Sequence, residues 1–206
     1  MTCEKLIGSL KKLLSTLMLK AHPFFAQYLQ KITANYFSSW SGIMFRSATI
    51  GHGNSADLIS GEGSAIAGGR WNPPGLHAVY GSLEPGLSVD ESLHAILRGF
   101  GFAPEDIHPR IIVGLEVRLQ AVLRLDIGSG DLDWLNTDEM LVLDWRAENA
   151  AGRETASQAL GRVAAEVGEA LIVRSAVRSG LNIVIFPDSM RTGSGVRIVH
   201  DDELPA

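Results

Sequence analysis

The chain has 206 residues, of which 46% are hydrophobic and 20% charged, the composition of a folded protein with a sizeable core. Its formal net charge of −5 argues against a general nucleic-acid binder, which usually presents a basic face. The single cysteine, Cys3, excludes an internal disulfide framework and suits a reducing cytosol. No apolar run approaches the roughly 18 residues of a membrane span. We therefore expect a cytoplasmic protein without membrane contact.

The first forty residues predict a helical extension. Leucines recur at helical spacing over residues 4–20. The apolar run there is too short for a signal peptide, and no cleavage site follows it. Pro23 suits the first turn of a second helix, whose apolar stripe extends over 24–36. We expect a two-helix extension at 1–40 and a main domain at 41–206. The stripe is interpreted as packing surface on that domain, with a partner or dimer contact as the alternative.

From residue 43 onward, short β-rich runs alternate irregularly with helical stretches. The uneven spacing and long loops argue against a regular βαβ repeat. The expected fold class is therefore α+β, with a mainly antiparallel or mixed sheet and flanking helices. We predict strands at 43–46, 78–80, 111–117, 122–126, 171–173, 182–186 and 196–199, and helices near 88–100 and 154–168.

Residues 51–76 form a glycine-rich segment with little apolar content. A long loop in a compact domain is usually functional or disordered, and the ending of this one in a tryptophan and two prolines favours an ordered binding loop. Gly61-Glu62-Gly63 lacks the third glycine of a dinucleotide fingerprint, and Gly69-Arg70 stands where a P-loop has its lysine. The scattered histidines do not match zinc-ligand spacing, so we expect no metal.

The end of this segment carries the most informative residues of the chain. It reads Gly68-Gly69-Arg70-Trp71-Asn72-Pro73-Pro74-Gly75, and Tyr80 and Glu91 follow. An arginine can donate two hydrogen bonds to a phosphate, a tyrosine can stack on a flat ring, and a carboxylate can stabilise a developing cation. These are the groups needed to bind a dinucleotide and break its glycosidic bond.

The order of motifs resembles the RES-domain family, named for an arginine, a glutamate and a serine. The resemblance covers about residues 43–200 and leaves the first forty residues outside. Members are toxins that pair with Xre-type antitoxins, and their fold is similar to ADP-ribosyltransferases. The matching segments are Phe45-Arg46, 59–64, 68–75, Val79-Tyr80, Glu91, Asp144-Trp145-Arg146, 158–162, 171–176 and 182–187.

This resemblance implies that NAD+ is the substrate. Its nicotinamide–ribose bond would be cleaved by phosphorolysis or hydrolysis, with inorganic phosphate as a co-substrate in the first case; some members transfer ADP-ribose to a protein. The family's arginines fall on Arg46 and Arg70, which we expect to hold the diphosphate. Tyr80 is expected to face nicotinamide, and Glu91 and Ser175 to set up the cleavage. An Xre-like antitoxin is the expected partner, and a homodimer is left open.

Glu91 also has an ordinary structural interpretation. Ser88 and Glu91 have the spacing of a helix capping box, which contributes about 0.5–2 kcal/mol. The family position favours catalysis, with Asp90 as a substitute cap. Arg174 stands where the family often has a proline before Ser175, which predicts an extra cation beside the site.

Other polar residues are interpreted as structural. Asn182 reads as a turn residue at the start of a strand rather than a donor at the site edge, and His52 as a loop residue. Trp145 and the segment 158–161 read as packing elements. Two alternatives to an enzyme remain at this point: a catalytically silent module that binds NAD+ or a partner, and an antitoxin-binding protein that depends on its N-terminal helices.

Overall fold

The computed structural model describes residues 19–99, 103, 107–126, 132–200, 202 and 204. It has the α+β architecture with a mixed sheet that the sequence predicts. The predicted helix at 4–20 falls almost wholly outside the described residues. Among the described helices, none is long and apolar enough to cross a membrane.

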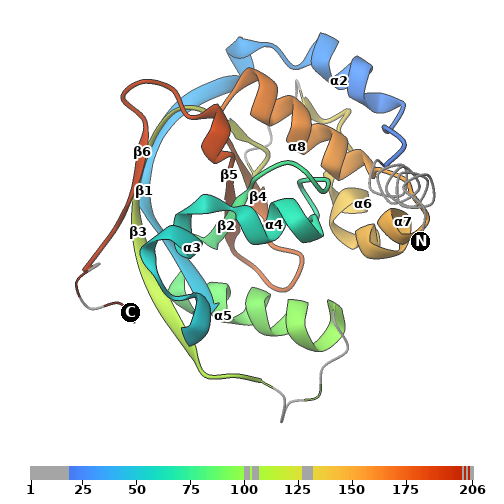
Figure 1. Cartoon of the computed structure of the whole chain (residues 1–206). Helices are drawn as coiled ribbons and strands as arrows, with labels where there is room; N and C mark the ends of the chain where they lie inside the picture. Colours follow the sequence, from blue (N-terminus) through green and yellow to red (C-terminus); the bar gives the residue numbers. More distant parts are fainter. Residues whose placement is uncertain are drawn as a thin grey trace, which may run out of the picture.

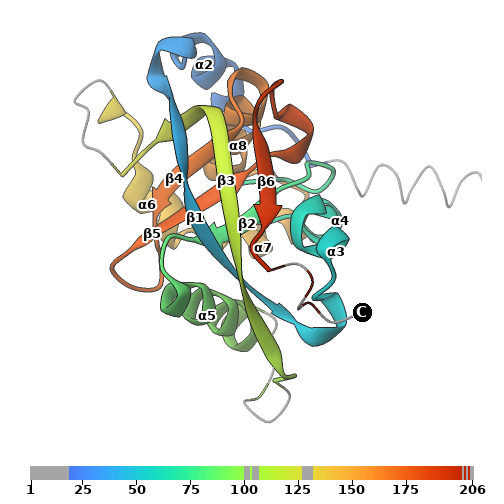
Figure 2. The same cartoon turned by 90° about the vertical axis from the view of Figure 1, so that its left-hand side faces the viewer.

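Six strands form one sheet in the order β1-β2-β5-β4-β3-β6, and β1 also pairs with β3, so the ladder closes on itself. All neighbouring pairs are antiparallel except β3 and β4, which are parallel. Figure 2 shows the long strands β1 and β3 together with the short strand β6 as one layer, with β2, β5 and β4 behind it. The strands are β1 (Phe37–Thr49), β2 (Val79–Ser82), β3 (Arg110–Arg124), β4 (Ala170–Arg174), β5 (Leu181–Ile185) and β6 (Gly195–Ile198).

Helices cover the layer formed by β2, β5 and β4 and the lower end of the sheet (Figure 1). A π-helical turn, Ala95–Gly99, extends α5, and short 3-10 turns lie at Ala34–Tyr36, Ile50–His52 and Pro187–Ser189. The α-helices are α2 (Phe24–Lys31), α3 (Ser55–Ser60), α4 (Glu62–Ala67), α5 (Pro85–His94), α6 (Thr137–Val142), α7 (Trp145–Ala150) and α8 (Ala156–Val167).

Two strands are longer than the sequence predicts. β1 begins at Phe37, so the expected boundary between residues 40 and 41 falls inside a strand. The predicted strands 111–117 and 122–126 are one continuous strand, β3. Between the two predicted strands, Arg118 and Gln120 are exposed while Leu119 between them is buried. They are the outward positions of an alternating strand.

The glycine-rich segment 51–76 is partly helical, which corrects the prediction of a loop. Asn54 caps α3, since its side chain accepts a hydrogen bond from the backbone N–H of Asp57 at 3.0 Å. Gly61 then joins α3 to α4 with a φ of 71°, a conformation that favours glycine. Each of these helices has six residues, too few for an apolar stripe to be recognised in the sequence. The unpredicted helices α6 and α7 are equally short.

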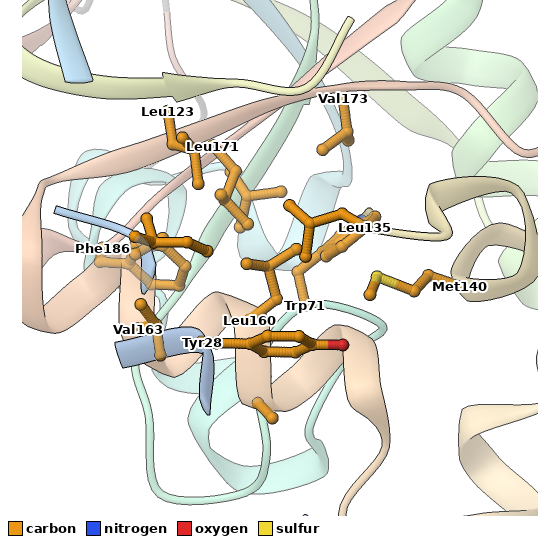
Figure 3. Close-up of a cluster of buried hydrophobic side chains, with 14 of the residues drawn as sticks. Tyr28, Trp71, Leu123, Leu135, Met140, Leu160, Val163, Leu171, Val173 and Phe186 are labelled. Atoms are coloured by element: carbon orange, nitrogen blue, oxygen red, sulfur yellow. The ribbon is translucent and has the colours of Figure 1, made fainter. Parts of the chain in front are cut away.

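The layer formed by β2, β5 and β4 separates two hydrophobic cores. In β4, Leu171 and Val173 point into one core while Ala170 and Ile172 point into the other, so this strand is buried on both faces. One core fills the space between the two strand layers. The other lies between the short strands and the helices, and Figure 3 shows its residues Tyr28, Trp71, Leu160, Leu171 and Phe186.

The second core includes α2. Tyr28 and Ile32 are buried in it, and α2 packs against α8. The apolar stripe that follows Pro23 therefore packs on the main domain.

Gly161 allows α8 to contact the segment that ends the glycine-rich region. A Cβ at Gly161 would lie 1.6 Å from the carbonyl oxygen of Trp71. We expect Gly161→Ala to lower the free energy of unfolding by about 1–3 kcal/mol or more, measured by equilibrium urea unfolding, because the helix and the segment must separate. Gly63→Ala in α4 is the matched control, since a Cβ there meets nothing within 4 Å; we expect it to be neutral or stabilising by about 0.5–1 kcal/mol. Equal stability of the two variants would contradict the close packing.

Candidate active site

Asn72 fixes the segment before β2 in place. Its side chain is fully buried, and Nδ2 donates to the carbonyls of Ser64 and Leu76 at 2.9 and 2.8 Å. Its Oδ1 accepts a hydrogen bond from the Tyr80 hydroxyl at 2.7 Å. One amide therefore holds α4, the turn after it and β2 together.

Two further contacts bring the Gly-Gly-Arg segment close to Tyr80. The Tyr80 hydroxyl oxygen accepts a hydrogen bond from the backbone N–H of Trp71 at 3.0 Å, and a Cβ at Gly69 would lie 2.4 Å from that oxygen. Gln158 of α8 donates from Nε2 to the Gly69 carbonyl at 2.9 Å and to Asn149 at 2.8 Å. Glycine is required at position 69 because only it lets the backbone approach the tyrosine this closely.

Tyr80 lies in β2 and packs against the core between the sheet and the helices. Burial raises the pKa of its hydroxyl. The hydroxyl both donates to Asn72 and accepts from Trp71, so it is satisfied within the protein. The part of Tyr80 that remains for contact with a ligand is the ring.

Arg46 lies in β1, next to β2. Its Nη1 donates to the Tyr80 carbonyl at 3.2 Å, whereas its Nε is buried and has no partner in the described part of the chain. Desolvation lowers the pKa of Arg46, the nearby charge of Arg110 lowers it further, and Asp57 raises it. An arginine remains charged in such surroundings. A buried cation with an unsatisfied N–H is suited to bind an anion.

Arg70 is anchored to the end of α6. Its Nη1 donates to the carbonyls of Met140 and Leu143 at 2.9 and 2.8 Å, which satisfies backbone groups that a helix end leaves unpaired. Burial lowers the pKa of Arg70, while the charge of Glu91 acts in the opposite direction. Arg70 is thus an electrostatic neighbour of Glu91, and it is held in place by one of its terminal nitrogens.

Glu91, in α5, meets residues from the ends of two strands. Ser175 donates from Oγ to Glu91 Oε1 at 2.6 Å, and Asn182 donates from Nδ2 to the same oxygen at 2.5 Å. Ser82 in turn donates to Asn182 Oδ1 at 2.7 Å. The structure therefore brings together Glu91 and Ser175, which lie far apart in the sequence.

The expected capping box at Glu91 is wrong. α5 begins at Pro85, with Glu84 in the N-cap position and no side-chain cap, so Ser88 lies inside the helix. The Ser88 hydroxyl donates to the Pro85 carbonyl at 2.7 Å. Proline favours the first helical position because it has no N–H to satisfy there, and it moves the start of the helix upstream. Glu91 is thereby free of a capping role.

Asp90 is not a cap either. It pairs with Arg178, whose Nε lies 2.6 Å from Asp90 Oδ2. The extra cation expected beside the site, Arg174, is exposed and pairs with Asp138 of α6. Arg178 is therefore the cation that ties the segment after Ser175 to α5.

The sequence interpretation missed Ser82 and underrated Asn182. The available signal was weak: Asn182 is the first residue of a predicted strand, and Ser82 lies two residues after another one. His52 hydrogen-bonds Asp57 at 3.0 Å on the surface, as a loop residue would. Trp145 is half-buried and stacks under the Arg146 guanidinium at 4.2 Å. Across the ranges that the structure describes, no group of three or more metal-ligating side chains occurs.

A family model described as the RES domain matches residues 38–206. This chain belongs to the RES-domain family, and its fold is α+β. It is similar to a chain in the crystal structure of the M. tuberculosis MbcT–MbcA toxin–antitoxin complex, with a TM-score of 0.57 and 20% identity, over 88% of this chain and 94% of that one. A search of the curated proteins finds no match.

The raised pKa of Tyr80 predicts a loss of stability in alkali. The unfolded chain releases this proton near pH ~10, whereas the folded protein keeps it to higher pH. The folded state then binds more protons, so the free energy of unfolding falls as the pH rises above ~10, by at most about 1.4 kcal/mol per pH unit for this group. We expect Tyr80→Phe to be less stable at neutral pH but to show a shallower alkaline slope in urea unfolding. Burial also raises the pKa of Tyr28, to about 12, but this group is common to both proteins. Identical slopes would contradict the assignment.

Proposed function

We propose that this protein is a toxin-type enzyme that degrades NAD+ by cleaving its nicotinamide–ribosyl bond. The observation that carries the proposal is the carboxylate of Glu91, which Ser175 and Asn182 hold through a single oxygen. Both of these hydrogen bonds fall on Oε1, and neither engages the other oxygen, Oε2. A carboxylate that is held on one side and open on the other is suited to stabilise positive charge on a substrate.

The reaction makes use of that negative charge. The bond between the ribosyl carbon and the ring nitrogen breaks, and its electron pair moves to nitrogen, so neutral nicotinamide leaves. Positive charge develops on the ribosyl carbon, where Glu91 would stabilise it. An oxygen of water or of inorganic phosphate then bonds to that carbon and gives ADP-ribose or its phosphate ester. The proton that water loses in the first case passes to Glu91 or to solvent.

The arginines would bind the other end of the substrate. Arg46 has a buried N–H without a partner, and Arg70 has one terminal nitrogen engaged and the rest of its guanidinium available. Each charge-assisted hydrogen bond to a diphosphate contributes about 1.5–3 kcal/mol. Tyr80 would present its ring to nicotinamide, since its hydroxyl is already engaged.

A direct test is incubation of the purified protein with NAD+, with and without inorganic phosphate, followed by chromatography with mass detection. We expect Glu91→Gln to reduce nicotinamide release by at least about 100-fold, because the neutral side chain no longer stabilises the cation. Arg46→Ala should raise KM more than it lowers kcat, because its role is binding. Glu166→Gln is the matched control on an exposed position of α8 and should behave as the wild type. Unchanged turnover in Glu91→Gln would refute the proposal.

The products separate the remaining alternatives. Release of nicotinamide only with phosphate identifies a phosphorylase, and release of free ADP-ribose without phosphate identifies a glycohydrolase. A mass increase on a protein identifies an ADP-ribosyltransferase. Intact NAD+ with measurable binding identifies a silent module.

An Xre-like antitoxin is the proposed partner, supported by membership of the family and by the likeness to a chain from a toxin–antitoxin complex. We expect production of the wild-type protein without that partner to stop bacterial growth and to deplete cellular NAD+. The Glu91→Gln protein should permit growth at the same expression level. Growth arrest by both proteins would show that toxicity does not come from this site.

A further inference from the structure

Behind Glu91 lies a chain of two hydrogen bonds that begins in the sheet. Ser82 of β2 and Asn182 of β5 are directly paired across the strands, and Ser82 is buried. The Ser82 hydroxyl donates to Asn182 Oδ1 at 2.7 Å, and Asn182 Nδ2 donates to Glu91 Oε1 at 2.5 Å. Asn182 is therefore more than the turn residue that its sequence position indicates.

The orientation of the Asn182 amide is determined by its two neighbours. An ionised carboxylate only accepts hydrogen bonds, so Asn182 must present its NH2 group to Glu91. Its carbonyl oxygen then faces Ser82, whose hydroxyl adapts by donating. The reverse orientation would place two acceptor oxygens against each other. The chain of bonds thus has one direction, from Ser82 through Asn182 to Glu91.

The chain of bonds also links two kinds of element. Asn182 and Ser82 lie in hydrogen-bonded strands, whereas Glu91 reaches them from α5. Ser175 supplies a second donor to the same oxygen of Glu91. Two donors from different directions restrict rotation of the carboxylate, and both leave Oε2 open.

We propose that Asn182 is a positioning residue that holds the Glu91 carboxylate against the sheet, so that Oε2 faces the substrate, and that Ser82 orients the Asn182 amide. This inference rests on the proposed function, because it explains what orients the Glu91 carboxylate in that reaction. Without Asn182, Ser175 alone would restrain Glu91, and the carboxylate would rotate away from the ribosyl carbon. A misplacement of about 1 Å costs roughly 100-fold in rate.

Asn182→Asp provides the sharpest test, because it keeps the size and the Ser82 contact but replaces the donor by an acceptor. Two carboxylates at this distance cannot both be ionised. We expect kcat to fall by roughly 100-fold at neutral pH, and the acid limb of the pH–rate profile to move to higher pH. Asn182→Ala should lower kcat with little change in KM, and Ser82→Ala should have a smaller effect of the same kind.

Asn136→Asp is the matched control. Asn136 also donates from Nδ2 to a glutamate, Glu139, at 2.9 Å, but on the exposed start of α6. We expect its kcat and pH profile to equal those of the wild type. An Asn182→Asp protein with a wild-type profile would overturn the inference. So would lowered thermal stability together with an unmoved acid limb, which would indicate a merely structural role.

A second measurement needs no substrate. The side-chain amide signal of Asn182 in the 1H–15N NMR spectrum of the whole chain is assigned by its loss in Asn182→Asp. We expect this signal to shift in Glu91→Gln and Ser82→Ala and to stay in place in Asn136→Asp. If the protein does not consume NAD+, the proposed function fails while such shifts still support the positioning of Glu91. If the Asn182 signal does not shift in Glu91→Gln, the inference is overturned, whatever the NAD+-cleaving activity of the protein.

Discussion

The hydrogen bond between the Tyr80 hydroxyl and the buried amide of Asn72 is the contact on which the rest of the site depends. It joins the end of the glycine-rich segment to the sheet, and Arg70 lies two residues before Asn72. Together with the hydrogen bond from the Trp71 N–H to the same hydroxyl, it holds the segment that carries Arg70 against β2. Gly69 has no side chain, which leaves room for this contact, and Gln158 donates a hydrogen bond to the Gly69 carbonyl.

The sequence predicts those parts of the fold that local pattern determines. The continuous apolar runs of β4 and β5 and the apolar stripe of α8 are local, and these elements lie where they are expected. The glutamate and serine of the site were identified by family resemblance, and the structure brings Glu91 and Ser175 within hydrogen-bond distance. The capping box failed because a proline three residues upstream competes for the helix start, a conflict that spacing alone does not resolve.

What the sequence does not reveal is pairing between distant strands. Nothing near Asn182 in the chain indicates that Ser82 lies opposite it or that Glu91 reaches its amide. Arg70 shows the same limit, since its bonds to the carbonyls that end α6 depend on a helix too short to recognise in advance. Both residues had plausible local interpretations, and in both cases the additional role comes from tertiary contacts.

The position of β5 in the sheet has a consequence for synthesis. This strand, Leu181–Ile185, is inserted between β2 and β4, and β2 otherwise has only a short pairing with β1. Ser175 and Asn182 follow Glu91 by 84 and 91 residues, so a ribosome must translate this whole stretch before Glu91 acquires its partners. Domains assemble as units once their segments have emerged. A growing chain therefore carries its arginines and its carboxylate without an organised site until β5 has joined the sheet.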